Sequence, residues 1–411
     1  MRVLLLAEAA NPEWVSVPLV GWSFFRALRE VADVHLVTQV RNRDAILRAG
    51  LVEGRDFTVI DTERLERPLW RVGTALRLGW TSRMAINALS YPYFERLVWA
   101  RFGPAIAAGD YDIVHRVTPL SPTVNSPIAA RCAKAGTPFV LGPLNGGLPW
   151  PRAFDAARRK EKEWLTYVRG AYKLAPGRRK TFDATRLIFA GSRHTESEIP
   201  NAYRSRTVYM PENGIDPSRF GGPGARSDFP PLRACFVGRL VPYKGPDMLL
   251  EAARDALGSG RMRLDIVGDG PMMADLKDMV ARFGLDGAVT FHGWLDHAAV
   301  PEVLGAAHVL TFPSIREFGG GVVLEAMALG VAPLVVDYGG PGELVSAQTG
   351  YKVPIGTRED IVAALQAEIA RILDNPAELQ TLSANGRQAC RATFTWDTKA
   401  RKILDAYEAL A

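Results

Sequence analysis

The sequence predicts an α/β fold of two doubly wound domains, each built around a parallel sheet. Short apolar runs typical of buried strands alternate with segments of helical spacing along most of the chain. At 411 residues, the chain exceeds what one hydrophobic core usually serves. The segment 218–231 is dense in Gly and Pro, and the alternation starts again after it. These observations favour two α/β domains joined by a linker.

Strand and helix patterns alternate in both halves of the chain. In the first half, apolar runs predict strands at 3–7, 34–38, 113–115, 139–141, 187–190 and 207–210. Helical spacing there covers 20–30 and a long arginine-rich stretch at 64–102. In the second half, strands are expected at 233–237, 264–267, 289–291, 309–312 and 333–336. Helices are expected from 247, from 272 and at 322–329, before a last set of helices. This alternation predicts Rossmann-like parallel sheets.

The domain boundary is expected at the Gly- and Pro-rich segment. We expect an N-terminal Rossmann-like domain at 1–217, a linker at 218–231 and a C-terminal Rossmann-like domain at 232–393. Ligands of open α/β sheets bind outside the carboxyl ends of the strands. Two such domains in tandem therefore predict a binding site in a central cleft that both domains face.

Composition narrows the class of protein. Apolar residues make up 47% and charged residues 23%, which excludes wholesale disorder, collagen-like repeats and a disulfide scaffold. The three cysteines lie far apart and form no CxxC pair, so we expect no zinc site and a reducing compartment. The apolar start is too short for a signal peptide, and no run of about 18 apolar residues follows. The sequence therefore predicts a cytoplasmic protein.

Positive charge is concentrated between Arg152 and Lys180, in a chain with a net charge of +6. Aromatic residues, including Trp164 and Tyr167, interleave these charges. Such a pattern is typical either of a basic amphipathic segment on an anionic membrane surface or of a solvated helix face. Peripheral contact of 152–180 with the inner face of the cytoplasmic membrane is therefore one expectation, and we expect no nucleic-acid partner.

The segment EFGGGVVLEAMALG at 317–330 carries the features of a ligand site. Three glycines, Gly319 to Gly321, let backbone N–H groups approach a ligand at a helix start, where a diphosphate fits. Glu317 lies before the helix and Glu325 within it. Carboxylates accept hydrogen bonds from vicinal sugar or ribose hydroxyls. The segment therefore predicts contacts to a diphosphate and to hydroxyl groups of one ligand.

A second cluster, GRLVPYKG at 238–245, follows the strand expected at 233–237. It places Arg239 and Lys244 at the carboxyl end of that strand. An Arg and a Lys after a strand are most often solvated loop charges, but the nearby Glu317 segment favours a ligand site here. Breaking the glycosidic bond of a sugar nucleotide leaves extra negative charge on the diphosphate. Two fixed cations would stabilise that state more than the substrate.

Together these motifs resemble those of the retaining glycosyltransferases of family 4, which are glycosyl transferases of group 1 with the GT-B fold. The matching elements occur in order over the second half of the chain. They are PENGID at 211–216, GRLVPYKG at 238–245, VGDGP at 267–271, FHGW at 291–294, Glu317 and Glu325 with seven residues between them, and GGPGELV at 339–345. One such motif alone is weak, but six in register are specific.

The resemblance implies roles for the matching positions. The implied diphosphate ligands are Arg239, Lys244, Gly320, Gly321 and Val322. The implied contacts to the base or to the donor sugar are Gly268, Trp294, Phe318 and Gly319. Glu325 binds the ribose hydroxyls, and Glu317 is a catalytic residue beside the reacting carbon of the donor sugar. For Trp294, a place in the core or in the wall of the cleft is the alternative to a contact with the base.

The resemblance also implies a mechanism and partners. Family members transfer a sugar from a nucleotide-diphosphate sugar with retention at the anomeric carbon, through an oxocarbenium-like state. The leaving phosphate takes the acceptor's proton, so no metal ion and no other cofactor is expected. The absence of an Asp-x-Asp metal motif in a suitable loop agrees with this. The first domain then binds a glycan or lipid-linked acceptor of cell-envelope polysaccharide synthesis, and a last helix at about 394–411 crosses back to it.

The first domain departs from the family's usual pattern. Its first βα loop carries Gly21 where relatives often have a Gly pair. His115 ends an expected strand and is either a catalytic group near the donor sugar or a histidine satisfied by local hydrogen bonds. Asn145, Gly146 and Ser192 follow later strands and are either cleft contacts or turn residues.

Other functions fit parts of the same pattern. A nucleotide-sugar epimerase or a phosphorylase of this architecture also needs phosphate contacts, although no lysine suited to pyridoxal phosphate stands out. A catalytically silent scaffold that binds polyanions or nucleotide sugars would show salt-dependent binding and release no nucleotide. A dinucleotide dehydrogenase is disfavoured, because neither domain begins with a G-x-G-x-x-G fingerprint after its first strand.

Overall fold

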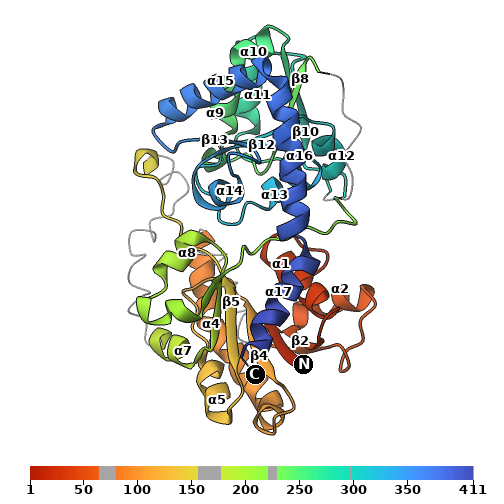
Figure 1. Ribbon diagram of the computed structural model, residues 1–411, viewed down its shortest axis with the longest axis vertical. Coiled ribbons are helices and arrows are strands. Elements are labelled where there is room, and N and C mark those ends of the chain that lie inside the picture. The colour runs from red at the N-terminus through yellow and green to blue at the C-terminus, as the bar shows by residue number, and fades with distance from the viewer. Residues whose placement is uncertain (64–79, 156–176, 221–228, 297, 411) are drawn as a thin grey trace. The chain divides into compact units, whose positions relative to one another are not determined.

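The computed structural model describes residues 1–63, 80–155, 177–220, 229–296 and 298–410 (Figure 1). Most of the basic segment at 152–180 lies outside these residues, as do parts of the expected linker and of the stretch at 64–102. The chain divides into two compact units. The first comprises Met1–Gly147, Arg158–Glu212 and Trp396–Ala411, and the second comprises Leu148–Ala157 and Asn213–Thr395.

The first unit is built on a seven-stranded parallel sheet of order β3-β2-β1-β4-β5-β6-β7. Its strands are β1 (Arg2–Ala7), β2 (Asp33–Gln39), β3 (Phe57–Ile60), β4 (Ile113–Thr118), β5 (Phe139–Leu144), β6 (Leu187–Ala190) and β7 (Thr207–Tyr209). Its helices include α1 (Val17–Leu28), α2 (Arg43–Arg48), α4 (Trp80–Ala107), α5 (Pro127–Ala135), α7 (Arg178–Ala184), α8 (Arg193–Glu198) and α17 (Trp396–Glu408). The strand order reverses between β1 and β4, as in other doubly wound sheets.

Alternate residues of each strand pack on opposite faces of this sheet. In β1, Val3 and Leu5 join a core cluster with residues of α1 and α17. Leu4 and Leu6 join a second cluster with residues of α4, α5 and α7. On the first face, α17 packs beside α1 (Figure 1). The expectation that the last helix crosses back to the first domain is therefore confirmed.

The second unit has a six-stranded parallel sheet of order β10-β9-β8-β11-β12-β13. Its strands are β8 (Leu232–Val237), β9 (Met262–Val267), β10 (Val289–Gly293), β11 (Val309–Phe312), β12 (Ala332–Val336) and β13 (Tyr351–Val353). Its helices include α9 (Pro246–Ala252), α10 (Arg254–Gly258), α11 (Met273–Arg282), α12 (Val300–Gly305), α13 (Gly321–Ala328), α14 (Gly339–Leu344), α15 (Arg358–Asp374) and α16 (Pro376–Thr393). The strands after which the motifs were expected are therefore neighbours, because β8 lies between β9 and β11.

The limits of the two units differ from the expected domain boundaries. The second unit begins at Asn213, ahead of the Gly- and Pro-rich segment, because Ile215 and Phe220 are buried in its core. The segment 148–157 also belongs to the second unit, since Trp150 is buried in the same core. The chain therefore passes between the units before the linker is reached, and hydrophobic burial rather than composition sets the boundary.

Lys399 ties α17 to the segment that leaves the first unit. Its buried Nζ donates hydrogen bonds to the carbonyl oxygens of Pro211 and Glu212. The same nitrogen lies 4.4 Å from the centre of the Trp396 ring. Burial lowers the pKa of Lys399 to about 7. Two points at which the chain passes between the units, after 212 and before 396, are thus held together inside the first unit.

Glycines let the loops at the carboxyl ends of β8 and β9 touch. Gly268 has a φ of +139°, and a Cβ atom there would lie 1.9 Å from the carbonyl oxygen of Gly238. Leu240 N donates a hydrogen bond to Asp269 O at 2.9 Å, which joins the two loops again. The VGDGP motif therefore fixes the path of the loop at 238–245 through direct backbone contact.

We expect Gly268→Ala to destabilise the second unit by about 3 kcal/mol, because the new Cβ would meet backbone atoms at an unfavourable φ. Gly260→Ala is the matched control. Gly260 has a φ of +73° but open space where its Cβ would lie, so the expected loss is about 1 kcal/mol. Urea unfolding measures both variants. Equal losses would show that contact with Gly238 is not what requires glycine at this position.

Candidate functional site

Two loops at the carboxyl edge of the second sheet are joined by hydrogen bonds. One follows β8 and contains Tyr243, and the other follows β11 and contains Ser314 and Ile315. The carbonyl oxygen of Tyr243 accepts from Ile315 N at 2.9 Å and from Ser314 Oγ at 3.2 Å. These bonds bring together the following parts of the two loops, in which Lys244 comes one residue after Tyr243 and Glu317 two residues after Ile315.

Lys244 and Glu317 form a salt bridge. Their side chains are 15% and 22% exposed, so the pair is partly screened from water. Lys244 Nζ also lies 4.8 Å from the centre of the Phe312 ring. Charge pairing and the aromatic face together hold both side chains in a defined geometry. The structure thus brings together two residues that the motifs had placed 73 positions apart.

Arg239 lies on the same loop as Lys244, but its side chain is exposed. Among the residues that the structure describes, no hydrogen-bond or ion-pair partner holds its guanidinium. A guanidinium in this state can bind an anionic oxygen pair without first giving up a carboxylate. The loop therefore presents two cations in different states, Lys244 neutralised by Glu317 and Arg239 open to a ligand.

The glycine segment forms the start of α13. Gly320 adopts a left-handed conformation with φ of +61° and ends the loop, and α13 begins at Gly321. The first N–H groups of a helix have no partner within the helix. Gly321 and Val322 are both partly exposed here. The arrangement expected for phosphate binding, a glycine turn followed by free helix amides, is therefore present.

The loop at 317–320 is held from behind by the start of α14. Gly340 N donates to Glu317 O at 3.0 Å, and a Cβ atom on Gly340 would lie 2.4 Å from Phe318 O. Gly319 is buried in the same contact, while the side chain of Phe318 is partly exposed. The glycine pair that opens α14 is therefore needed for close approach of two backbones. Gly319 is buried against Gly340, so its role is to let the loop pack closely on the start of α14.

Glu325 is partly exposed on α13. Burial raises the pKa of its carboxyl to about 7, and the field of Arg219 acts in the opposite direction. At neutral pH this carboxyl is therefore divided between its protonated and ionised forms, unlike an ordinary surface glutamate. Sequence analysis did not single out Arg219, because nothing in the spacing of 219 and 325 indicates that they are neighbours.

Gly268 and Trp294 follow neighbouring strands. Gly268 is buried, and its N–H donates to Gly293 O at 2.8 Å. Loop packing explains why glycine is required here, and a contact of Gly268 with the ligand stays a prediction. Trp294 is 66% exposed, which contradicts a place in the core. Its contact with a nucleotide base stays a prediction.

A segment that sequence analysis missed supports both loops. Trp150 is 7% exposed, and its ring packs edge-on against Tyr243, with ring centres 6.0 Å apart. The guanidinium of Arg316 lies 5.1 Å from the centre of the Trp150 ring and 5.3 Å from that of Phe318. Trp150 thus contacts the residues that directly precede both members of the ion pair. The TrpPro sequence around it gave no signal for this role, since the contact is entirely tertiary.

A comparison with known protein families identifies the domain that contains this site. Residues 227–389 match the family model described as glycosyl transferases group 1. The second unit is a group 1 glycosyltransferase domain. The matched range contains the ion pair, the glycine helix start and Glu325.

Two named proteins are similar to this chain in sequence over about half of its length. The chain is 33% identical over 197 residues to a glycogen synthase of Mycobacterium tuberculosis, which covers 47% of each protein. It is 32% identical over 251 residues to a GDP-mannose-dependent alpha-(1-6)-phosphatidylinositol monomannoside mannosyltransferase of the same organism. That match covers 55% of this chain and 63% of the relative. The chain thus spans about half to three-fifths of the length of these relatives.

Solved structures share the fold over the whole chain. Anabaena Alr3699/HepE in complex with UDP has a TM-score of 0.67 at 15% identity, with 100% of both chains covered. Sucrose-phosphate synthase from Thermosynechococcus elongatus has a TM-score of 0.64 at 18% identity, covering 100% of this chain and 98% of that one. The expected GT-B fold of two Rossmann-like domains is therefore confirmed.

His115, in the unit that accompanies the group 1 domain, is fully buried. Its Nε2 lies 2.7 Å from the carbonyl oxygen of Gly142, which only accepts, so the proton is on Nε2. Its Nδ1 then accepts from the hydroxyl of Tyr407 on α17. Burial lowers the pKa of His115 to about 3. Both ring nitrogens are bonded away from solvent, which favours the alternative of a histidine satisfied by local hydrogen bonds. A catalytic role of His115 stays a prediction.

The other residues expected to contact a ligand from the first unit have packing and turn roles. A Cβ atom on Gly21 would lie 2.2 Å from a backbone oxygen of the preceding loop. Asn145 Oδ1 accepts from Gly146 N at 2.8 Å. Ser192 Oγ caps α8 by accepting from Thr195 N at 3.1 Å. These contacts favour turn roles for Asn145, Gly146 and Ser192, and Gly21 is required by the close approach of α1 to the preceding loop. Ligand contacts of these residues stay a prediction.

The described part of the chain was considered for metal-binding groups and membrane-spanning helices because both bear on function. Within it, no group of three or more His, Cys, Asp or Glu side chains is arranged to hold a metal ion. No helix there is both long enough and apolar enough to cross a membrane. The basic segment at 152–180, proposed as a membrane contact, lies mostly outside the described residues, so that expectation stays a prediction.

We expect Tyr407→Phe to destabilise the first unit by about 1–3 kcal/mol, because it leaves the buried Nδ1 of His115 without a donor. Tyr203→Phe is the matched control. Its hydroxyl donates to Asp183, whose side chain is 55% exposed and can bond to water instead, so the expected loss is below about 1 kcal/mol. Urea midpoints of both variants test this. An unchanged midpoint for Tyr407→Phe would contradict the role of the buried hydrogen bond.

Proposed function

We propose that the protein is a retaining glycosyltransferase. It moves a sugar from a nucleotide-diphosphate sugar to a glycan or lipid-linked acceptor and uses no metal ion or other cofactor. The observation that carries this proposal is the Lys244–Glu317 ion pair beside the glycine start of α13, within a group 1 glycosyltransferase domain. The names of the two relatives, a glycogen synthase and a mannosyltransferase, support the same reaction class.

The diphosphate is captured by one cation and one helix start. Arg239 is exposed and open to a ligand, and the first amides of α13 carry the positive end of the helix dipole. When the bond between sugar and diphosphate breaks, negative charge grows on the leaving group. Groups that are fixed before the reaction stabilise this charge without reorganising, which lowers the barrier. Lys244 adds a third positive group at the edge of the same loop.

The two carboxyl groups bind hydroxyls of the donor. Lys244 is bonded to Oε2 of Glu317, and the other oxygen has no partner among the described residues. That oxygen can accept a hydrogen bond from a hydroxyl of the donor sugar, while the ion pair fixes its direction. Glu325 binds the ribose hydroxyls in its ionised form. The acceptor binds to the first unit.

A screen of donors tests the reaction class. The full chain is incubated with UDP-, GDP- and ADP-sugars, and melting temperature and release of nucleoside diphosphate are measured. A bound donor raises the melting temperature, because it stabilises the native state alone. A transferase releases nucleoside diphosphate when an acceptor is present, whereas an epimerase returns an intact sugar nucleotide. Absence of both effects with all three bases would count against the proposal.

We expect Arg239→Gln to lower kcat/KM for the best donor by about 10²–10³-fold, because a charge that stabilises the leaving diphosphate is lost. Arg254→Gln is the matched control. Arg254 is also an exposed arginine of the second unit, but it lies on α10 and its guanidinium packs against the ring of Phe283. Steady-state rates of nucleotide release compare the two. A loss below threefold for Arg239→Gln would remove this residue from the diphosphate site.

Nucleotide affinity is expected to rise about tenfold between pH 6 and pH 8. The pKa of Glu325 is about 7, so its carboxyl gains the ionised form that accepts ribose hydroxyls as the pH rises through 7. Titration of the best nucleoside diphosphate at several pH values measures this. Phosphate itself titrates near pH 6, so Glu325→Gln is the control and should retain only that part of the dependence. An identical profile for both proteins would contradict the role of Glu325.

A further inference from the structure

Residues 148–154, which we call the bridging segment, contact several loops at the carboxyl edge of the second sheet. In the loop after β8, Tyr243 meets the ring of Trp150 edge-on. In the loop after β11, the guanidinium of Arg316 lies 5.1 Å from the centre of the same ring. These two loops carry Lys244 and Glu317, so one side chain of the bridging segment touches both halves of the candidate site.

The bridging segment also contacts the loop after β12. The hydroxyl of Tyr338 donates a hydrogen bond to Pro149 O at 2.8 Å. A Cβ atom on Gly339 would lie 2.6 Å from Cδ2 of Leu148, so side chain and loop backbone pass close together. The strands β8, β11 and β12 are neighbours in the sheet. The segment therefore joins the ends of three adjacent strands.

Buried aromatic rings fix the bridging segment in the second unit. Trp150 and Phe154 both belong to the core cluster of that unit. A single turn of 3-10 helix, η2 (Arg152–Phe154), leads to the second ring, and Phe154 N donates to Pro151 O at 3.0 Å. Large rings buried at two points hold a short segment firmly, because each one removes a large apolar area from water.

Arg316 transmits this anchorage to the loop after β11. Its side chain is buried, and its guanidinium lies between two rings, 5.1 Å from that of Trp150 and 5.3 Å from that of Phe318. A cation–π contact is stronger when the cation is removed from water. Arg316 and Phe318 flank Glu317 in the sequence. Loss of the Trp150 ring would thus free one side of the cation on which the position of Glu317 depends.

We propose that Trp150 is a positioning residue of the transfer reaction. It acts through Tyr243 and Arg316, the residues that precede Lys244 and Glu317, and so sets where the Glu317 carboxylate lies relative to the donor sugar. A misplacement of about 1 Å in such a group can lower a rate about 10²-fold. This inference rests on the proposed function, which gives Glu317 its place beside the donor sugar.

A purely structural role for Trp150 makes a different prediction. If the ring only filled the core, its replacement would lower stability and leave the kcat of the folded protein unchanged. If it positions Glu317, kcat falls while the affinity for the nucleoside diphosphate is kept. That affinity is expected to persist, because Arg239 is exposed and the start of α13 packs on α14 instead. The split between kcat and nucleotide affinity therefore separates the two roles.

The test compares Trp150→Leu with Tyr351→Leu in the full chain. Tyr351 is the matched control, since its buried ring also lies against a guanidinium, that of Arg371 at 5.0 Å, but at the amino end of β13. Both variants should lower the melting temperature. We expect only Trp150→Leu to lower kcat, by at least about tenfold, with the nucleoside diphosphate Kd changed by less than about threefold. A kcat within threefold of the native value would overturn the proposal, as would equal losses in the two variants.

Two further variants test the contacts that carry the effect. Trp150→Phe keeps a ring against Tyr243 and Arg316, so it should recover most of the kcat that Trp150→Leu loses. Arg316→Met removes the cation between the rings and should lower kcat at least about fivefold at unchanged nucleotide Kd. Arg316→Met carries the test if Trp150→Leu does not fold. Native kcat in Arg316→Met would overturn the proposal.

Hydrogen exchange measures the restraint itself without any substrate. The amide of Ile315 is bonded to Tyr243 O and reports on the junction of the two loops. We expect Trp150→Leu to speed its exchange at least about tenfold and Tyr351→Leu to leave it unchanged. Unchanged exchange in Trp150→Leu would overturn the restraint. Failure of the native chain to release nucleotide from any donor would instead contradict the proposed function and leave the restraint standing.

Discussion

Backbone contact between loops is the constraint on which the site of the second unit depends. The loops after β8 and β9 touch at Gly238 and Gly268, and the loop after β11 is backed by the glycines that open α14. These contacts tolerate no Cβ atom, so they exclude almost every other residue. Because the loops are fixed in this way, Lys244 and Glu317 form their ion pair within the protein itself. Such preorganisation is what electrostatic stabilisation of a leaving group requires.

The segment at 148–157 extends this support with residues from the first half of the chain. It belongs to the second unit, although the chain before and after it belongs to the first. Trp150 packs on Tyr243 and lies close to Arg316, which are the neighbours in sequence of the ion pair. The donor loops therefore pack against a segment that the chain enters from the first unit.

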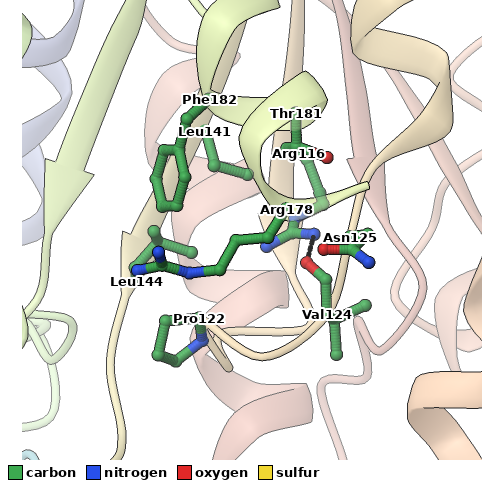
Figure 2. Close-up of a pocket in the computed structure, with 9 residues that line it drawn as sticks. All are labelled: Arg116, Pro122, Val124, Asn125, Leu141, Leu144, Arg178, Thr181 and Phe182. Carbon is green, nitrogen blue, oxygen red and sulfur yellow. Dashed lines mark hydrogen bonds between the residues drawn. The ribbon is translucent and has the colours of Figure 1, made fainter. Parts of the chain in front are cut away.

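Adjacent residues of β4 serve different purposes because a strand turns alternate side chains to opposite faces. His115 faces α1 and α17, where Tyr407 and Gly142 satisfy its ring and make it part of the core. Arg116 faces the opposite side of the sheet, where Nη1 bonds to Val124 (Figure 2) and Ser126 while two of its nitrogens are buried without a described hydrogen-bond partner. His115 was expected to be functional because of its residue type, but both of its ring nitrogens are hydrogen-bonded. Arg116 beside it is the residue that keeps buried N–H groups without a described partner.

The sequence by itself determined most strands and the residues of the donor loops. The strand at 309–312 was placed without error, and the motif spacing identified Arg239 and Lys244 through local glycine and charge patterns. The short strands β3 and β13 were missed. Only tertiary structure decided that His115 is buried, that Trp150 supports the loops and that Arg116 lines a cavity. Each of these depends on contacts between distant residues, and local patterns do not record which distant side chains meet.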